Sequence, residues 1–221
     1  MPTVLAFDVN ETLLDLRALD PLFESVLGDP ALRPQWFNSM LQLSFVGGLT
    51  GEYVDFTRAQ QAALRMTAAS AGRRVTDDDV ARVVDAMRRL PAHPEVPKAL
   101  SRLRSGGFRL VALTNSVLDV AKAQLAYAQL ADLFDATFSA DEVHALKPAP
   151  APYRMVADRC EVPIEDLWLV AAHAWDVSGA MAAGCHAAFV ARSGRIPSPL
   201  GRQPDIIGAD LAAVADELLM R

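Results

Sequence analysis

The sequence predicts an α/β fold, a doubly wound parallel sheet with a helical cap inserted after the first strand. Three features of the 221-residue chain indicate this architecture. A short apolar strand at residues 4–7 ends in a carboxylate, Asp8. Residues 16–87 then follow helical periodicity and contain no convincing strand. From about residue 94 onward strands and helices alternate, which is typical of a parallel sheet with crossover helices.

This pattern predicts two domains. The expected core domain comprises residues 1–15 and 92–221, and the expected cap comprises residues 16–91. We expect about four cap helices, with a break at Gly47 and Gly48 before the third of them. The later strands of the core are predicted at residues 109–113, 136–138, 167–171, 187–190 and 205–207.

The composition is that of a globular protein with a sizeable apolar core, since 52% of the residues are hydrophobic and 22% are charged. A formal net charge of −6 argues against nucleic-acid or anionic-membrane partners, which need a basic face. No stretch approaches 18 uncharged apolar residues, and the N-terminus shows no signal-peptide pattern. Cys160 and Cys185 lack CxxC spacing, so we expect buried thiols in a cytoplasmic protein.

Polar side chains follow the predicted strands of the core. They are Asp8 and Thr12, then Thr114 and Asn115, then Lys147, and finally His173 and Asp176. Because the carboxyl ends of parallel strands meet at one edge of the sheet, we expect these side chains to converge. Lys147 would keep Asp8 ionised by charge pairing. Thr114 and Asn115 can donate hydrogen bonds to an anionic substrate, and Asp176 can orient or deprotonate a water.

Four segments carry a resemblance to a known family: FDVNETLLD, LTNS, ALKPAPAPY and AHAWD. The order Asp-x-x-x-Thr, Thr-Asn, a lone Lys before prolines, and an acid after the fourth motif-bearing strand resembles the haloacid dehalogenase (HAD) superfamily. The helical insertion after the first segment resembles the cap of that superfamily. The residues of these four segments most resemble the L-2-haloacid dehalogenase (type II) branch. The resemblance runs over nearly the whole chain.

The resemblance implies a hydrolase that uses covalent catalysis on a small anionic 2-halo acid. Asp8 would displace halide and form an aspartyl ester, with Thr12 fixing the angle of its carboxylate. A water activated by Asp176 would then hydrolyse the ester to a 2-hydroxy acid, with help from Lys147 or His173. The implied substrate-binding residues are Val9, Asn10, Thr114, Asn115, Tyr153 near Lys147, and Trp175 in the apolar wall around the halogen. A homodimer is also implied.

Two features favour halide over phosphate chemistry. By the resemblance, HAD phosphatases use an acid two residues after the nucleophile, because an alkoxide leaving group needs a proton, and Asn10 cannot supply one. Phosphatases also gather carboxylates for Mg²⁺ around the fourth motif, where Asp176 stands alone. We therefore expect neither a metal nor another cofactor. A Mg²⁺-dependent phosphatase acting on a small metabolite stays open as an alternative, as does a non-catalytic HAD-fold protein that binds a small acid.

Three features depart from the pattern of the branch. The cap arginine that reaches the leaving halide would fall at or near Gly47, but residues 34–57 contain no arginine. A serine and an asparagine that position the hydrolytic water are Ala171 and His173 here, and Glu11 replaces a usual glycine. Stabilising developing charge is often worth about 3–4 kcal/mol, so either the substrate differs or another group supplies the charge. His173 is the candidate for that charge, and the alternative is a packed structural histidine.

Overall fold

The computed structural model describes residues 3–221 and contains one parallel six-stranded sheet with strand order β3-β2-β1-β4-β5-β6. The strands are β1 Val4–Phe7, β2 Arg109–Thr114, β3 Ala136–Ser139, β4 Leu167–Ala171, β5 His186–Val190 and β6 Ile206–Gly208. All four residues of β1 are buried, and β1 pairs with β2 on one side and β4 on the other. The direction of strand progression reverses at this point, which is where open α/β sheets bind ligands. The predicted fold class is confirmed.

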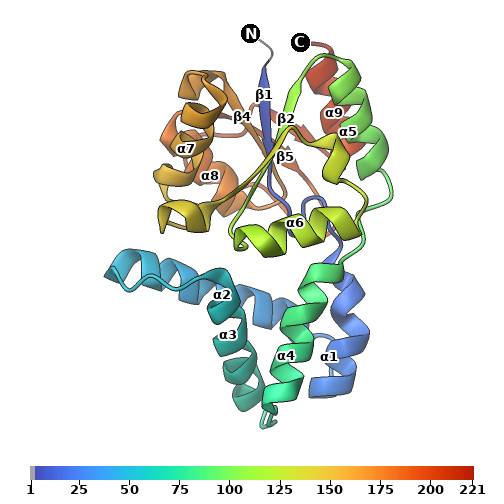
Figure 1. Ribbon diagram of the computed structural model, residues 1–221, viewed down its shortest axis with the longest axis vertical. Helices are drawn as coiled ribbons and strands as arrows, with labels where there is room; N and C mark the ends of the chain where they lie inside the picture. Colours follow the sequence, from blue (N-terminus) through green and yellow to red (C-terminus); the bar gives the residue numbers. More distant parts are fainter. Residues whose placement is uncertain (1–2) are drawn as a thin grey trace.

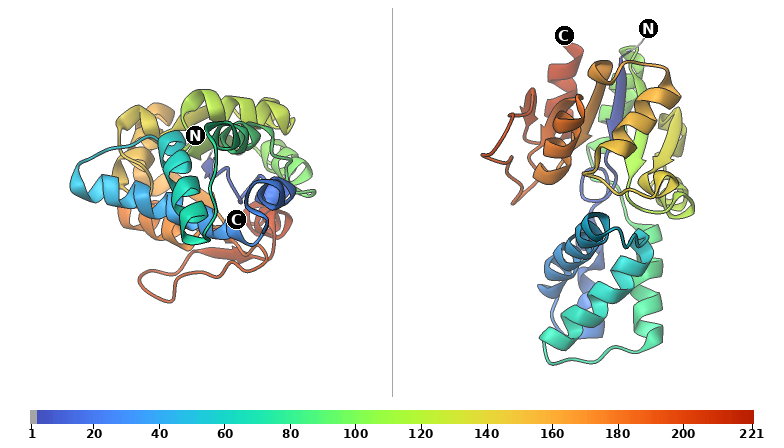
Figure 2. Two further views of the ribbon diagram at one scale, coloured as in Figure 1. Left: turned by 90° about the horizontal axis from the view of Figure 1, so that it is seen from below. Right: turned by 90° about the vertical axis from the view of Figure 1, so that its left-hand side faces the viewer.

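Helices cover both faces of the sheet (Figures 1 and 2). On one face lie α7 (Pro150–Cys160) and α8 (Ala174–Ala183), and on the other lie α5 (Val96–Ser105) and α9 (Leu211–Leu219). Helix α6 (Leu118–Tyr127) lies beside β3 and also packs on the last turn of the cap. Short 3₁₀ helices lie at Ala131–Leu133, Ala140–Val143 and Ile164–Asp166.

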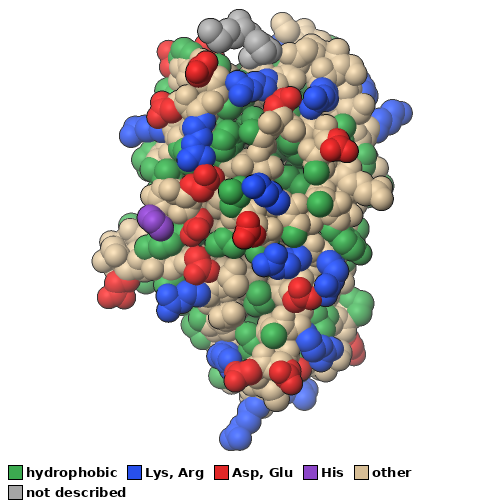
Figure 3. Space-filling model, in the orientation of Figure 1, with side chains coloured by type: hydrophobic (Ala, Val, Ile, Leu, Met, Phe, Trp, Pro, Cys, Tyr) green, Lys and Arg blue, Asp and Glu red, His purple; other side chains and the backbone are tan. Residues whose placement is uncertain are grey.

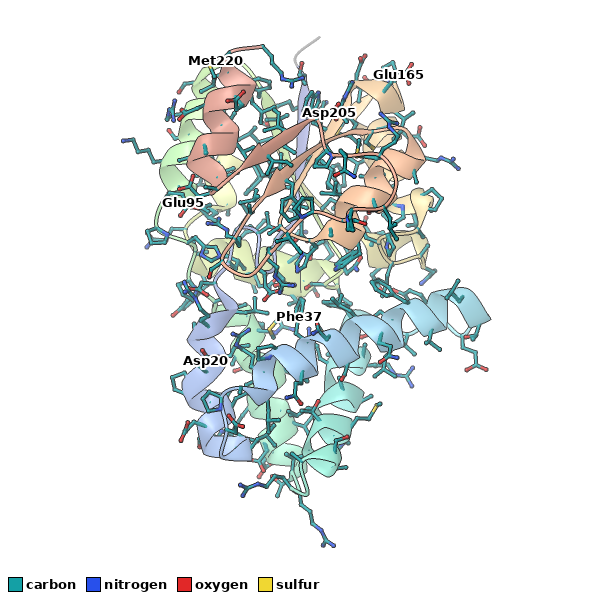
Figure 4. The ribbon with its side chains drawn as sticks, turned by 180° about the vertical axis from the view of Figure 1, so that it is seen from behind. Asp20, Phe37, Glu95, Glu165, Asp205 and Met220 are labelled. Atoms are coloured by element: carbon teal, nitrogen blue, oxygen red, sulfur yellow. The ribbon has the colours of Figure 1, made fainter. Side chains whose placement is uncertain are left out.

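Residues 16–91 form a block of helices beyond the carboxyl ends of the strands, below the sheet in Figure 1. The helices are α1 Asp20–Leu27, α2 Leu32–Thr50, α3 Phe56–Ser70 and α4 Asp77–Ala86, with 3₁₀ helices at Leu16–Leu19 and Met87–Arg89. Buried cap residues such as Trp36 and Phe37 belong to the same apolar cluster as Leu5 and Phe7 of β1. In Figure 4, Phe37 on α2 lies at the boundary between the cap and the core. The cap therefore covers the edge of the sheet at which Asp8 emerges.

The structure corrects the expected helix break at Gly47 and Gly48. Helix α2 continues through both glycines to Thr50 and ends at Gly51, whose φ of 76° lies in the left-handed region. A Cβ atom on Gly47 would lie 2.7 Å from the backbone carbonyl oxygen of Glu52. Gly47 is therefore a point of close backbone approach and not a helix terminator.

The two cysteines lie in the interior, and charged side chains of both signs lie on the surface. Cys160 and Cys185 are both buried and free. Basic and acidic side chains are interspersed on the face shown in Figure 3. Among the helices of residues 3–221, none combines the length and the apolar character that a membrane span requires.

Candidate active site

The carboxylate of Asp8 is the centre of a buried cluster of charged and hydrogen-bonding groups. Its Oδ1 accepts a hydrogen bond from Lys147 Nζ at 2.9 Å. Its Oδ2 accepts from the Thr12 hydroxyl at 2.6 Å and lies 3.1 Å from His173 Nδ1. Burial acts to raise the pKa of Asp8, but Lys147 and His173 outweigh it and hold this pKa well below its usual range. Asp8 is therefore an ionised carboxylate in a site from which water is largely excluded.

Lys147 joins Asp8 to a second acid on the other side. Its ammonium group donates to Asp8, to Asp176 Oδ2 at 2.7 Å and to the carbonyl oxygen of Leu113 at 2.9 Å. All three ammonium protons are thus used. Burial lowers the pKa of Lys147, but the charges of Asp176 and Asp8 reverse this and raise it. Lys147 is consequently a fixed cation and has no lone pair with which to act as a base.

Asp176 is held by Tyr153 as well as by Lys147. The Tyr153 hydroxyl donates to Asp176 Oδ1 at 2.6 Å, and both side chains are fully buried. Burial is the largest influence on Asp176 and raises its pKa, against the opposing effect of Lys147. A carboxylate with a raised pKa is a stronger base than an exposed one. Tyr153 and Lys147 therefore bond the two oxygens of the same carboxylate.

His173 occupies the opposite side of Asp8, between two carboxylates. Its Nδ1 faces Asp8 Oδ2, and its Nε2 lies 2.9 Å from Oε2 of Glu11. Burial lowers the pKa of His173, but its hydrogen bonds to Asp8 and Glu11 and their charges together raise this pKa to about 9. His173 is thus a second cation next to Asp8.

Aromatic side chains surround the His173 ring. Phe37 of the cap stacks on it with ring centroids 5.8 Å apart, and Trp175 stacks on it at 5.2 Å. Phe45 of the cap meets Trp175 edge-on at 5.4 Å. The Nε1 atom of Trp175 is buried and has no hydrogen-bond partner among the residues that the structure describes. Aromatic faces stabilise a cation held against them, so this packing favours a charged His173.

Backbone groups and neighbouring side chains fix the inner residues. The Thr12 hydroxyl accepts from the backbone N–H of Ala172 at 2.9 Å, which leaves its own proton for Asp8. The Thr12 carbonyl accepts from Arg192 Nη2 at 2.7 Å. The side-chain amide of Asn115 bonds the backbone of Lys147 at both ends, at 2.8 and 3.2 Å. These contacts hold Thr12 and Lys147 in place before any ligand binds.

Three of the expected substrate-binding side chains are directed elsewhere. The Asn115 side chain is committed to the Lys147 backbone, so only its main chain remains to meet a substrate. Asn10 donates to Ser116 Oγ and accepts from Gln124 in a buried amide network, away from Asp8. The side chain of Val9 is wholly buried in the apolar core. These residues therefore support the loop, because short polar side chains in a buried turn bond the nearest backbone or amide group first.

The remaining predicted position, Thr114, is fully buried at the end of β2. Its hydroxyl oxygen accepts from the backbone N–H of Ser116 at 3.1 Å, which leaves its proton available to donate.

Gly47, where the resemblance puts a cap arginine, lies away from Asp8. Gly47 lines a hollow within the cap, together with residues such as Val54 and Ala62, and none of the residues around Asp8 borders that hollow. The cap side chain that the structure places against the site is Phe37, on an earlier turn of α2. The sequence offered no signal for this role, because Phe37 belongs to an ordinary apolar stripe of a helix.

A cleft of about 580 Å³ lies beyond Glu11, where the cap meets the core. Its lining includes Glu11, Arg33, Glu95, Arg192 and Arg195. In Figure 4, Glu95 of the core and the cap residue Asp20 are labelled along the same edge of the molecule. Sequence reasoning noted Glu11 only as a departure and missed Arg33 and Arg195, since they come from a helix and a loop that only folding brings to Glu11.

The two carboxylates nearest to Lys147 are those of Asp8 and Asp176. Residues 3–221 contain no group of three or more His, Cys, Asp or Glu side chains arranged to hold a metal ion. The ammonium group of Lys147 lies between Asp8 and Asp176 and already bonds both carboxylates.

Comparison with known proteins places the chain in a family. Residues 2–184 match the sequence model of the haloacid dehalogenase-like hydrolases. The chain is 29% identical over 201 residues to (S)-2-haloacid dehalogenase 2 of Pseudomonas sp. (strain CBS-3), covering 90% of this chain and 88% of the relative. It is 31% identical over 180 residues to (S)-2-haloacid dehalogenase 1 of the same organism, covering 80% and 79%.

Solved structures agree with these sequence matches. The L-2-haloacid dehalogenase from Xanthobacter autotrophicus is 25% identical, with a TM-score of 0.92 over 99% of this chain and 98% of that one. The same enzyme with chloropropionic acid covalently bound gives the same TM-score. With the family model matched over residues 2–184 and the same fold in solved L-2-haloacid dehalogenases, the chain belongs to the haloacid dehalogenase-like hydrolases.

Proposed function

We propose that this protein hydrolyses the carbon–halogen bond of a small 2-halo acid, with Asp8 as the nucleophile. The observation that carries the proposal is the setting of the Asp8 carboxylate, which is ionised, buried and held between Lys147 and His173. Its relatives are named (S)-2-haloacid dehalogenases, and one similar structure has chloropropionic acid covalently bound. We also propose that residues 1–15 with 92–221 and residues 16–91 act as core and cap domains.

In the first step, Asp8 Oδ1 attacks the carbon that bears the halogen. Oδ1 accepts from one donor and Oδ2 faces two, so charge is less stabilised on Oδ1 and this oxygen is the better nucleophile. The bond from Oδ1 to carbon forms while the carbon–halogen bond breaks, and the halogen leaves with the bonding electron pair. The product is an aspartyl ester. No proton is needed for the leaving group, which is consistent with Asn10 in place of an acid.

The departing halide meets positive charge from His173 and a free donor from Trp175. Among residues 3–221 the buried indole N–H of Trp175 has no acceptor, and its ring packs on the charged imidazole ring. These two groups take the role that the resemblance assigns to a cap arginine. The carboxylate of the substrate would bind the Thr114 hydroxyl and the backbone N–H of Asn115 at the end of the neighbouring strand.

In the second step, water attacks the ester at Cγ of Asp8, with Asp176 as the base. The carbonyl oxygen of the ester is Oδ2, which lies 2.6 Å from the Thr12 hydroxyl and 3.1 Å from His173 Nδ1. These distances suit donors that stabilise an oxyanion. Asp176 accepts one proton of the water as it attacks, the bond from Cγ to Oδ1 breaks, and Asp176 returns that proton to Oδ1. The 2-hydroxy acid leaves with Oδ1 as its hydroxyl oxygen, and the second proton of the water is released when Asp8 ionises. Asp8 regains its carboxylate with one oxygen taken from water.

The test is a panel of small halo acids and phosphate esters, each assayed with and without EDTA. The proposal predicts halide release from a 2-halo acid such as 2-chloropropionate that EDTA leaves unchanged. EDTA-sensitive phosphate release would instead support the phosphatase alternative. Binding of 2-chloropropionate without turnover of any panel member would support the non-catalytic alternative. The homodimer and the cytoplasmic location stay predictions, and sedimentation analysis tests the first of them.

A further inference from the structure

Glu11 has an unusual backbone conformation at the edge of the site. Its φ of 62° lies in the left-handed region, which glycine adopts easily and which strains a residue with a side chain. The chain nevertheless places a glutamate here, three residues after Asp8. Strain of this kind persists where the side chain makes contacts that hold it.

Among the residues that the structure describes, the polar partners of the Glu11 carboxylate are His173, Arg195 and Arg33. Its Oε2 lies 2.9 Å from His173 Nε2 and also accepts from Arg195 Nη2. Its Oε1 lies 3.9 Å from Arg33 Nη1, and Arg33 is itself anchored to Asp20 at 2.5 Å. The Glu11 side chain is only 14% exposed. Burial raises the pKa of Glu11, but its bond and charge interactions with His173 and Arg195 outweigh this and lower it.

The geometry around His173 settles which form of the ring is present. Both ring nitrogens face carboxylate oxygens, Nδ1 toward Asp8 and Nε2 toward Glu11. An ionised carboxylate only accepts hydrogen bonds, and a neutral imidazole has a single N–H. Only the imidazolium ion satisfies both contacts at once.

We infer that Glu11 is a positioning residue that holds His173 as an imidazolium with its Nδ1–H aimed at Asp8. The inference rests on the proposed function and deepens it, because it identifies what keeps the second cation charged. Glu11 does not touch the reacting atoms. It acts through His173, and Arg195 and Arg33 hold Glu11 in turn.

The charged groups in contact with the His173 ring come from the end of β1 and the turn that follows it. Asp8 comes from the end of β1 and pairs with Lys147. Glu11 comes from the following turn and pairs with Arg195 and Arg33. Helices α2 and α8 present uncharged aromatic rings, Phe37 and Trp175. Asp8 and Glu11 are thus the two anions in contact with the ring, and their combined effect raises the pKa of His173 to about 9.

The direct test is a pH titration of the four histidines by NMR in histidine-labelled protein, with His173 assigned from the signal lost in His173→Asn. In the wild type, we expect the His173 signal to stay in the charged form from pH 6 to 8. In Glu11→Gln, we expect the titration midpoint of His173 to fall by about one to two pH units, because the side chain at position 11 loses its negative charge. An unchanged midpoint in Glu11→Gln, or a neutral His173 in the wild type at pH 7, would overturn the inference.

Two further variants separate this effect from a loss of fold. Glu11→Gly removes the same charge but suits the left-handed backbone, so it should lower the His173 midpoint as Glu11→Gln does and lower the melting temperature less than Glu11→Gln. Glu95→Gln removes another carboxylate of the same cleft, one that pairs with Arg192 and lies apart from His173. We expect Glu95→Gln to leave the His173 midpoint unchanged, and an equal fall there would contradict a specific role for Glu11.

Turnover supplies the second readout. If Glu11 acts through His173, kcat of Glu11→Gln should stay within about threefold of wild type at pH 6. It should fall as pH increases, with the same midpoint as the lowered NMR titration of His173. A purely structural role would lower kcat equally at every pH and would contradict the inference. Because the NMR midpoint needs no turnover, failure of the dehalogenase proposal and failure of the Glu11 inference give different results.

Discussion

The two oxygens of the Asp8 carboxylate face two different environments. On the Oδ1 side, Lys147, Asp176 and Tyr153 are fully buried, and every proton of the ammonium group has an acceptor. On the Oδ2 side, the chain of contacts runs through His173 to Glu11 and Arg195, whose side chain is 32% exposed at the wall of a cleft. One side is closed and fixed, and the other reaches the solvent.

This difference separates two tasks. A buried ion cluster is costly to disturb, because removing one member leaves uncompensated charge in a region of low dielectric. The Oδ1 side therefore fixes the charge and geometry of Asp8 and Asp176, the proposed nucleophile and base. A histidine between two carboxylates responds to pH near neutrality once either carboxylate changes, so the Oδ2 side is where activity can be tuned.

Asp8 joins the two sides, so its replacement should have the largest effect. We expect Asp8→Asn to lower kcat by roughly 10⁴-fold or more, as for other removed nucleophiles. Halide release from 2-chloropropionate measures this, with Asp15→Asn as a control on an acid that pairs with Arg17 at the surface. If Asp8→Asn retained more than a tenth of the wild-type rate, Asp8 would not be the nucleophile.

Breaking the Oδ1 side should cost the most stability. Lys147→Met leaves Asp8 and Asp176 buried without their shared cation, so we expect the free energy of unfolding to fall by about 3–5 kcal/mol. Urea denaturation measures this at pH 7. Lys98→Met, which changes an exposed lysine of α5, serves as the control. Equal stabilities of the two variants would show that the cluster contributes little.

The strand-end residues of the Oδ1 side were predictable from the sequence, and the reason is geometric. A parallel sheet brings Asp8 at the end of β1, and the connections that follow β3 and β4 with Lys147 and Asp176, to one edge. Glu11 was visible only as a non-glycine residue in a turn. Its partners Arg33 and Arg195 were not predicted, because a cap helix and a loop carry no periodicity that specifies a contact with Glu11.

The sequence also did not predict the direction in which the turn side chains point. Asn115 was expected to bind substrate, and its side-chain amide instead bonds the backbone of Lys147. Asn10 lies in a network with Gln124, which is far away in sequence. A motif indicates where a residue lies in the chain, whereas the direction of its side chain depends on which polar partners are left unsatisfied after folding.

The Oδ2 side should make stability depend on pH between neutrality and pH 9. The pKa of His173 is about 9 in the folded protein against an ordinary 6.5, so its contribution is complete below pH 6.5 and is lost as pH rises through 9. We expect the free energy of unfolding to fall by about 3 kcal/mol over this range. Urea denaturation at pH 6.5 and 9 measures it. His173→Asn should show a much smaller fall, and an equal one would assign the effect to another group.

A smaller effect is expected at Tyr153. Tyr153→Phe removes one hydrogen bond to a buried carboxylate, so the free energy of unfolding should fall by about 2 kcal/mol. That bond also lowers the pKa of Asp176, so its loss should move the acidic limb of the pH–rate profile to higher pH. A profile that shifts to lower pH, or does not move, would contradict Asp176 as the base.

The central claim is that Asp8 itself carries the reaction through a covalent ester, and labelled water tests it most directly. One turnover of 2-chloropropionate by excess protein in H₂¹⁸O should give an unlabelled 2-hydroxy acid and ¹⁸O in the peptide that contains Asp8, as read by mass spectrometry. Label in the hydroxyl of the product, with none in Asp8, would mean that water attacks the substrate directly and would contradict the account.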